Sequence, residues 1–290
     1  MLSKSCASEK FSILNIFRTI KYRFRFALEN PDYFNPDGLL CFCGPQGSGK
    51  TLSAVNYVYK LMEMYPNSIL VSNINLSDYP IVTFEEYKHN HMKLHNAVRT
   101  NCKEYVQEEF IDQAANDIMY SFYLRDNRVF LFQDNDDLSR YNNDDRGVIF
   151  LIDEIQLYMN SLKSANINMD TMTQISQQRK QRKHIVATSQ VFGRMAKPLR
   201  EQFSNVVVCK CILGCLQYNK LIDRDDIAES TDDSHITGAV KTKFIWTHHP
   251  KMYKKYDTYY VIEKGKFVSN EEKKGDIYSN DNSNGLPNSD

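Results

Sequence analysis

The segment that most constrains the fold is residues 44–51, Gly-Pro-Gln-Gly-Ser-Gly-Lys-Thr, which matches the phosphate-binding pattern G-x4-G-K-[S/T]. The apolar run before it, residues 39–43, does not alternate with polar residues, as is typical of a parallel strand covered on both faces. Apolar residues at helical spacing follow from Leu52 to Tyr65. This order of strand, glycine-rich turn and helix is the setting in which the pattern binds phosphate.

Each residue type in this loop has a chemical reason to bind a nucleotide. Glycines let backbone N–H groups turn inward around an anion, at a helix N-terminus that carries partial positive charge. Lys50 is expected to bridge the β- and γ-phosphates, and the Thr51 hydroxyl to coordinate Mg2+. We expect ATP rather than GTP, because no guanine-reading Asn/Thr-Lys-x-Asp motif is found. The predicted nucleotide-binding residues are Gly44, Pro45, Gln46, Gly47, Ser48, Gly49, Lys50, Thr51 and Leu52.

A second apolar run, residues 148–152, ends in two acids, Asp153 and Glu154. This is the Walker B pattern, in which the first acid holds Mg2+ through water and the second polarises the attacking water. An acid after a strand also occurs as a helix N-cap. Together with residues 44–51, the pair favours hydrolysis, with Thr51 and Asp153 at the metal and Glu154 as catalytic base.

A polar residue closes the next expected strand, residues 184–189, which should lie beside the Walker B strand. The amide of Gln190 at this position can sense the γ-phosphate or position water. A polar residue that merely ends a strand is the alternative interpretation, and the sequence leaves both open.

A compact basic cluster, residues 178–184, precedes that strand. Arg179 or Arg182 is a candidate arginine finger, which would reach the nucleotide of a neighbouring subunit and stabilise transition-state charge. Arg194 and Arg200 are further candidates. Cations at a helix C-terminus also offset the helix dipole, so the sequence does not choose among the four.

Strands expected at 68–74, 148–153, 184–189 and 206–212 alternate with helices. This alternation indicates an α/β fold, a P-loop NTPase with a mainly parallel central sheet flanked by helices. The expected organisation is a basic amphipathic helix with its linker over 1–37, a P-loop ATPase domain over 38–239 with a long helical insertion at 78–147, a small β-rich appendage over 240–268 and a disordered tail over 269–290. Within the insertion, the polar residues 134–146 are expected to be solvated.

The N-terminal residues 11–28 have the pattern of a basic amphipathic helix. The apolar stripe consists of Ile13, Phe17, Ile20, Phe24 and Leu28. Arg18, Lys21 and Arg25 lie mostly off this stripe. We expect a helix docked on the core with its cations in water; contact with a membrane surface or a nucleic acid is the alternative.

Composition places the chain among ordinary globular proteins without naming a partner. The 36 Lys and Arg residues balance 36 Asp and Glu residues. Seven Cys is an odd number for a disulfide framework and indicates reduced thiols in the cytoplasm. No run approaches the roughly 18 apolar residues of a membrane span, and the N-terminus lacks the apolar core of a signal peptide. We therefore expect a cytoplasmic protein, with a peripheral membrane or virion-associated position left open.

Four short motifs follow the phosphate-binding loop in an order that resembles the N-terminal ATPase domain of the zonular occludens toxin (Zot) family. They are residues 71–76, 152–156, 178–184 and 188–190. That family includes filamentous phage assembly proteins and is similar to the HerA/FtsK superfamily of DNA-pumping motors. The resemblance implies nucleotide and metal binding by Lys50 and Thr51, hydrolysis driven by Asp153 and Glu154, and γ-phosphate sensing by Gln190. It also implies that an arginine near 179–182 acts in trans within a ring.

The activity that the resemblance implies is an ATPase motor, in a homo-oligomeric ring, that moves DNA in phage or mobile-element genome packaging or virion assembly and export. A capsid or membrane assembly partner would belong to such a system. Family members that export phage usually carry a transmembrane helix after the ATPase domain, and none is expected here. The alternatives are a regulatory P-loop NTPase and a nucleotide-dependent assembly scaffold without DNA translocation.

Overall fold

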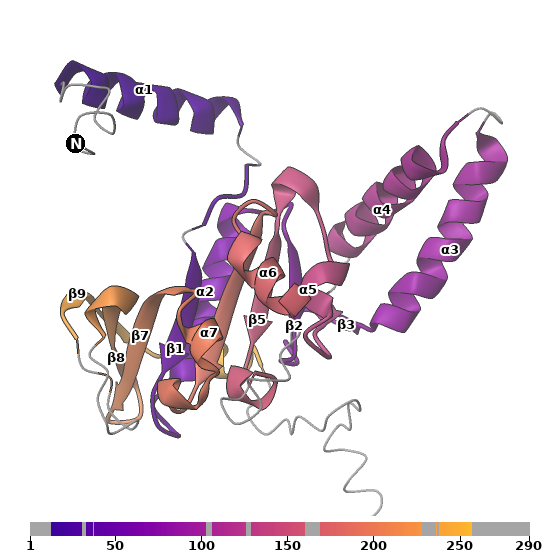
Figure 1. Ribbon diagram of the computed structural model, residues 1–290. Helices are drawn as coiled ribbons and strands as arrows, with labels where there is room; N and C mark the ends of the chain where they lie inside the picture. Colours follow the sequence, from indigo (N-terminus) through magenta and orange to yellow (C-terminus); the bar gives the residue numbers. More distant parts are fainter. Residues whose placement is uncertain are drawn as a thin grey trace, which may run out of the picture.

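The computed structural model describes residues 13–30, 33–36, 38–102, 106–125, 129–159, 169–227, 236 and 238–256. One nine-stranded sheet organises this part of the chain (Figure 1). Its strands in spatial order are β3 (Ile81–Val82), β4 (Val129–Leu131), β2 (Ile69–Ser72), β5 (Val148–Ile152), β6 (Lys183–Ser189), β1 (Leu39–Cys43), β7 (Phe203–Ile212), β8 (Leu216–Asp223) and β9 (Val240–Thr247). The helices are α1 (Ile13–Glu29), α2 (Lys50–Met64), α3 (Phe84–Asn101), α4 (Glu108–Arg125), α5 (Asp137–Arg140), α6 (Met169–Gln177), α7 (Lys197–Arg200) and α8 (Pro250–Tyr253).

The strands from β3 to β7 are all parallel to their neighbours, and only the β7–β8 and β8–β9 pairs are antiparallel. The predicted α/β class with a mainly parallel sheet is therefore confirmed. As expected, β6 lies beside β5, and it separates β5 from β1.

Two hydrophobic cores cover the two faces of the sheet. Alternate residues of a strand point to opposite faces, so Leu40 and Phe42 of β1 pack with α2, whereas Leu39 and Cys41 pack with α6 and α7 on the other side. All five residues of β1 are buried. Burial on both faces explains why this strand is a continuous apolar run.

The expected insertion, residues 78–147, builds a helical hairpin and one edge of the sheet. α3 and α4 pack against each other and stand out from the body (Figure 1). Their base is aromatic: the ring of Tyr87 lies 5.4 Å from that of Phe130 in β4. The segment therefore belongs to the same core as the sheet.

The expectation that residues 134–146 are solvated is wrong in part. Asp137 and Asn143 are buried. The Asp137 carboxylate accepts N–H bonds from Gln133 and Asp134 at 2.7 and 3.2 Å and a bond from Arg140 at 2.9 Å. A buried carboxylate is tolerated when its oxygens are satisfied in this way.

The N-terminal helix α1 stands apart from the body (Figure 1), which contradicts the expectation that it docks on the core. Its large apolar side chains are exposed with respect to all the described residues. An amphipathic pattern predicts that one face is covered, but it does not identify the covering surface.

Residues 240–247, expected in a separate appendage, form β9 and extend the central sheet. The predicted tail, residues 269–290, lies outside the described residues. Within the described part of the chain, no helix has the length and apolar character that a bilayer crossing requires.

Candidate active site

The parallel strands bring several predicted residues to one edge of the sheet. β1, β2, β5 and β6 run in the same direction, so their C-terminal ends meet at the same edge. Residues 44–49 follow β1, Asn73 follows β2, Asp153 and Glu154 follow β5, and Gln190 follows β6. In parallel α/β sheets, ligands bind at this edge.

The loop between β1 and α2 requires its glycines. Gly49 caps α2 in the left-handed conformation at φ 77°, and a Cβ there would lie 2.1 Å from Oε1 of Gln217. Gly47 also has φ 77°, a conformation that side chains with a Cβ disfavour. The turn therefore cannot form with ordinary residues at these two positions.

The donor set of the loop fits an anion. The Oγ of Ser48 is buried and has no hydrogen-bond partner among the described residues, and such a group favours a ligand that accepts its proton. The backbone of α2 begins at Lys50 and adds its N-terminal N–H groups. The side chain of Leu52 is buried in the core, so only its backbone can take part.

Glu154 is held by three side chains. Its Oε1 lies 3.0 Å from Nζ of Lys50 and accepts a bond from Nε2 of Gln190 at 3.2 Å. Its Oε2 accepts a short bond from Gln156. The predicted base, lysine and sensor are therefore within contact distance of one another.

The surroundings of Glu154 determine its charge. Burial raises the pKa of its carboxyl, but the hydrogen bond from Gln156 and the positive charge of Lys50 outweigh burial and leave the pKa below its ordinary value. Glu154 is thus a carboxylate at neutral pH, the form that accepts a proton from water.

Asp153 lies beside the hydroxyl groups of two threonines. Its Oδ1 accepts bonds from Thr51 at 3.0 Å and Thr188 at 2.5 Å. Burial raises the pKa of Asp153, and the two hydroxyl bonds oppose that shift. Thr51 and Asp153, predicted together at the metal, are in direct contact, and their oxygens are hard ligands of the kind that Mg2+ prefers.

Glu154 has a strained backbone, which turns the chain sharply after β5. Its φ is 50°, a left-handed conformation that costs a residue with a Cβ about 1 kcal/mol. Its N–H donates to Oγ1 of Thr188 at 3.0 Å. The same hydroxyl thus fixes both acids, through the side chain of Asp153 and the backbone of Glu154.

Sequence reasoning assigned no role of their own to Asn73 and Thr188. The amide of Asn73 accepts the Asp153 N–H at 2.8 Å and donates to the Asp153 carbonyl at 2.9 Å. Both residues are polar and buried at or after a strand end. Their place at the C-terminal ends of neighbouring parallel strands was the available signal.

Gln217 was also missed, and no signal in the sequence pointed to it. It is fully buried on β8, and its Nε2 donates to the Ser48 carbonyl at 2.9 Å and to Asn219 at 2.7 Å. Its Oε1 lies 3.1 Å from Nε2 of His248. The antiparallel end of the sheet therefore braces the phosphate-binding loop from behind.

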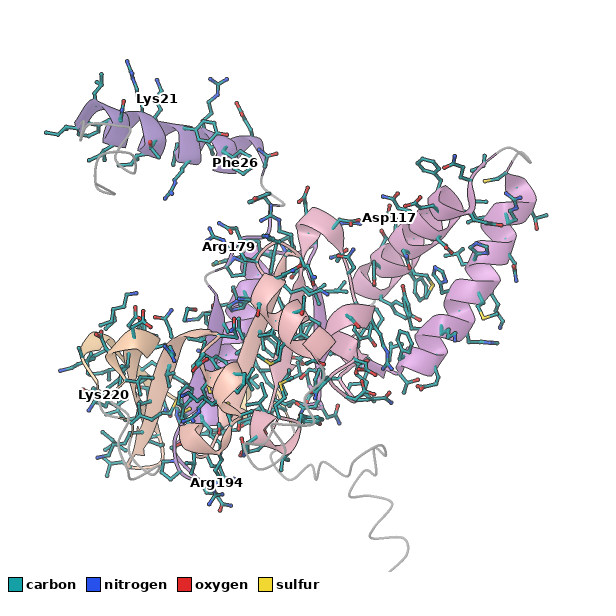
Figure 2. The ribbon with its side chains drawn as sticks, viewed as in Figure 1. Lys21, Phe26, Asp117, Arg179, Arg194 and Lys220 are labelled. Atoms are coloured by element: carbon teal, nitrogen blue, oxygen red, sulfur yellow. The ribbon has the colours of Figure 1, made fainter. Side chains whose placement is uncertain are left out.

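The basic cluster 178–184 lies at the opposite edge of the sheet, at the start of β6. Arg182 contacts Tyr33 and lies 3.4 Å from Asp145, and neither residue belongs to the site. Figure 2 shows Arg179 near this edge and Arg194 near the other. β6 separates the two edges by about 20 Å at ~3.3 Å per residue. Within the subunit, Arg179 and Arg182 are therefore not brought to the site.

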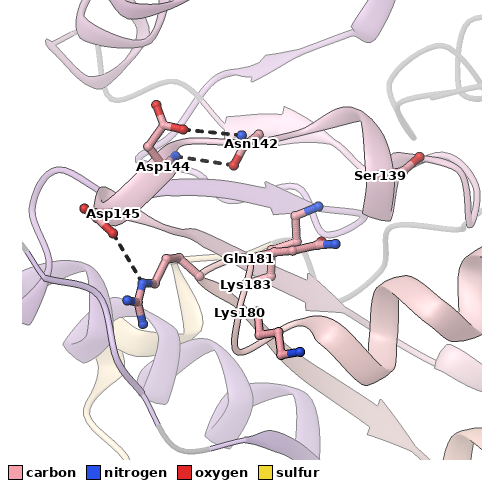
Figure 3. Close-up of a pocket in the computed structure, with 8 residues that line it drawn as sticks. Ser139, Asn142, Asp144, Asp145, Lys180, Gln181 and Lys183 are labelled. Carbon is pink, nitrogen blue, oxygen red and sulfur yellow. Dashed lines mark hydrogen bonds and ion pairs between the residues drawn. The ribbon is translucent and has the colours of Figure 1, made fainter.

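The cluster instead lines a separate cavity of about 590 Å³ (Figure 3). Arg182 and Asp145 form the ion pair drawn there. Nζ of Lys183 donates to the Leu138 carbonyl at 2.6 Å. These contacts give the cluster a structural role within the chain.

A phosphate-binding loop after β1 and an acidic pair after β5, at one edge of a parallel sheet, define the P-loop NTPase fold. No protein-family model and no curated protein matches the chain.

Several solved structures are similar to it. One is the N-terminal domain of zonular occludens toxin from Neisseria meningitidis, with 15% identity over 76% of this chain and 98% of that one and a TM-score of 0.45. A second is the genome packaging NTPase B204 from Sulfolobus turreted icosahedral virus 2 in complex with AMP, with 10% identity over 74% and 98% of the two chains and a TM-score of 0.41. A third is another ATPase domain, with 15% identity over 86% and 99% of the two chains and a TM-score of 0.40.

Proposed function

We propose that the chain is an ATP-hydrolysing motor that moves DNA in the genome packaging or virion assembly of a phage or mobile element. Its ATPase activity rests on one observation: Lys50, Gln190 and an ionised Glu154 converge at the end of β5. A phosphate-binding lysine beside a carboxylate base is the arrangement that nucleotide hydrolysis requires. In this proposal Glu154 accepts the proton of the attacking water, and Gln190 positions that water or senses the γ-phosphate.

Mg2+ fits the residues present. Thr51 and Asp153 would hold it, since their oxygens are 3.0 Å apart and Asn73 and Thr188 fix Asp153. When bound, the ion neutralises phosphate charge. The chain's own contribution is to orient the Asp153 carboxylate and to keep the loop N–H groups turned inward.

A basic strand face supports DNA as the cargo. Lys220 of β8 lies directly opposite Lys243 of β9 in the ladder. Lys210 of β7 lies opposite Tyr218, which is on the same face as Lys220. Like charges directly opposite each other destabilise a sheet, and a polyanion such as a DNA backbone would relieve that repulsion. The motifs shared with the zonular occludens toxin family imply the same cargo.

We propose a ring in which an arginine acts on the neighbouring subunit's nucleotide. Arg194 is exposed and follows β6 at the edge of the site (Figure 2), which favours it over Arg179 and Arg182. Arg194→Ala subunits mixed with Lys50→Ala subunits should regain turnover, because each supplies what the other lacks. Failure of this rescue, with rescue of Arg179→Ala or Arg182→Ala instead, would return the role to the basic cluster.

Steady-state ATP hydrolysis with and without single- and double-stranded DNA, alongside mass in solution, tests the function. Stimulation by one DNA form in an oligomer is the expected result. Lys220→Glu with Lys243→Glu should lose that stimulation and keep the basal rate, whereas Lys60→Glu with Lys93→Glu, exposed lysines of α2 and α3, serves as the charge-matched control. DNA-indifferent turnover by a monomer would favour a regulatory NTPase. Binding without turnover would favour a scaffold.

A further inference from the structure

The helix α1 presents an apolar face that none of the described residues covers. The face consists of Ile13, Ile16, Phe17, Ile20, Phe24 and Leu28, whose exposed fractions run from 46% to 68%. At 100° per residue these positions fall within one contiguous sector of the helix. Single exposed apolar residues are common, but a contiguous row marks an interaction surface.

The contacts of α1 with the rest of the chain lie on its other side. The ring of Phe26 packs edge-on against Tyr33 at 4.9 Å. Phe26 is about 200° around the helix from Phe24, so this contact turns the apolar face away from the body. The next residue, Phe34, is buried, and its N–H donates to the Asp145 carbonyl at 2.9 Å. The helix is thus attached with its apolar face outward.

Cations border the apolar face on both sides. Arg23 lies along one edge, and Lys21 and Arg25 lie along the other, with Arg18 farther round. The one acid of the helix, Glu29, bonds to Arg25 at 2.7 Å. Helices with an aromatic and aliphatic face and a Lys/Arg border lie in the plane of a membrane interface, where the cations contact lipid phosphates.

A second copy of the helix fits this surface less well. α1 has 17 residues, about 26 Å at 1.5 Å per residue, whereas sustained coiled-coil pairing needs about three to four heptads. The cations on both edges would also face the same charge on the partner helix. The charge pattern therefore calls for an anionic occupant.

We propose that α1 docks the protein on the surface of an anionic lipid bilayer, with the apolar face among the acyl chains and the cations at the lipid headgroups. This inference does not rest on ATP hydrolysis. The linker joins the body at the start of β6, where Tyr33 contacts Arg182. The candidate active site lies at the opposite edge of the sheet, so docking leaves it turned away from the bilayer.

Flotation of the full chain with vesicles tests this proposal. One set contains phosphatidylcholine alone and the other contains about 30% phosphatidylglycerol; the composition brackets the anionic charge of natural leaflets. We expect binding to the anionic vesicles at least about tenfold stronger than to the neutral ones, and weaker binding as salt is raised. Equal binding to both sets, or no binding to either, would overturn the proposal.

A matched pair of variants assigns the binding to the apolar face. Ile20→Asp and Thr19→Asp add the same charge at adjacent positions, but Thr19 lies off the apolar face. Ile20→Asp should weaken vesicle binding by at least about tenfold more than Thr19→Asp, since burying an Ile is worth about 1.5–3 kcal/mol and tenfold is about 1.4 kcal/mol.

The alternative occupant and the proposed function are separated in the same experiment. If Ile20→Asp dissolves an oligomer and leaves vesicle binding unchanged, the face is an interface between copies and the proposal is wrong. Lys50→Ala should abolish turnover and keep vesicle binding. Loss of hydrolysis by the wild type would therefore contradict the proposed function and leave membrane docking standing.

Discussion

Nζ of Lys50 lies 3.0 Å from Oε1 of Glu154, so the cation of the phosphate-binding loop and the acid after β5 form an ion pair. Both side chains are largely buried, with 9% and 17% exposed. Removing one partner from such a pair leaves an uncompensated charge. The positive charge of Lys50 also helps to hold the pKa of Glu154 below its ordinary value, which couples phosphate binding to the state of the base.

Lys50→Ala should lower ATP affinity by at least about tenfold, or ~1.4 kcal/mol, because a charge-assisted contact to phosphate is lost. The pKa of Glu154 should rise, since one of the groups that lowers it is gone. Calorimetric titration with ATP checks the affinity. Lys60→Ala, an exposed lysine on the same helix, is the control, and equal affinity of the two variants would refute the role of Lys50.

Gln217→Leu should weaken ATP binding although the residue lies behind the loop. The change removes the bond to the Ser48 carbonyl and leaves a buried acceptor unsatisfied, at a cost of about 1–3 kcal/mol. Ser53→Ala is the matched control, because it removes the neighbouring Asn219–Ser53 bond and keeps the Gln217–Ser48 bond. We expect KM for ATP to rise about tenfold for Gln217→Leu only. An equal rise in both variants would show a general loss of packing.

Lys183 should make stability depend on alkaline pH. Burial lowers its pKa from 10.5 to about 8, so between these values the unfolded chain keeps a proton that the folded chain has released. The free energy of unfolding therefore rises with pH in this window. Between pH 7 and 9.5 the wild type should gain at most about 2 kcal/mol relative to Lys183→Met.

Denaturant titrations at several pH values measure this slope. Lys180→Met, which removes an exposed lysine from the same cluster, is the control and should keep the wild-type slope. A wild-type free energy of unfolding that runs parallel to that of Lys183→Met across the window would contradict the assignment.

The elements around the site were predictable because motif and pattern agree there. The predicted strand at residues 39–43 is β1 itself, and the predicted strand ending at Asp153 differs from β5 by one residue. Both strands are buried on two faces, so each is an apolar run with a sharp polar end. Since parallel strands end at one edge, the meeting of Thr51 with Asp153 followed from the motifs.

The rest depends on pairings that local sequence does not encode. Gln217 reaches Ser48 across 169 positions through the antiparallel pairing of β7 with β8, and no periodicity reports that register. For α1, the amphipathic pattern predicted a buried face, whereas the structure turns that face outward through the Phe26–Tyr33 contact. Asp137 was expected in water because its neighbours are polar, but its backbone and arginine bonds allow burial.

Hydrolysis at this site is tested most directly by the Glu154→Gln variant, with the turnover rate and ATP affinity measured on the same sample. The amide cannot accept a proton from water, so we expect turnover to fall by at least about 100-fold, within the range of a general base. ATP affinity should stay within about threefold of the wild type, because Lys50 and the loop are retained. Glu201→Gln, an exposed acid, should behave as the wild type. Wild-type turnover by Glu154→Gln would contradict the account, because the carboxylate beside Lys50 would then not be the catalytic base.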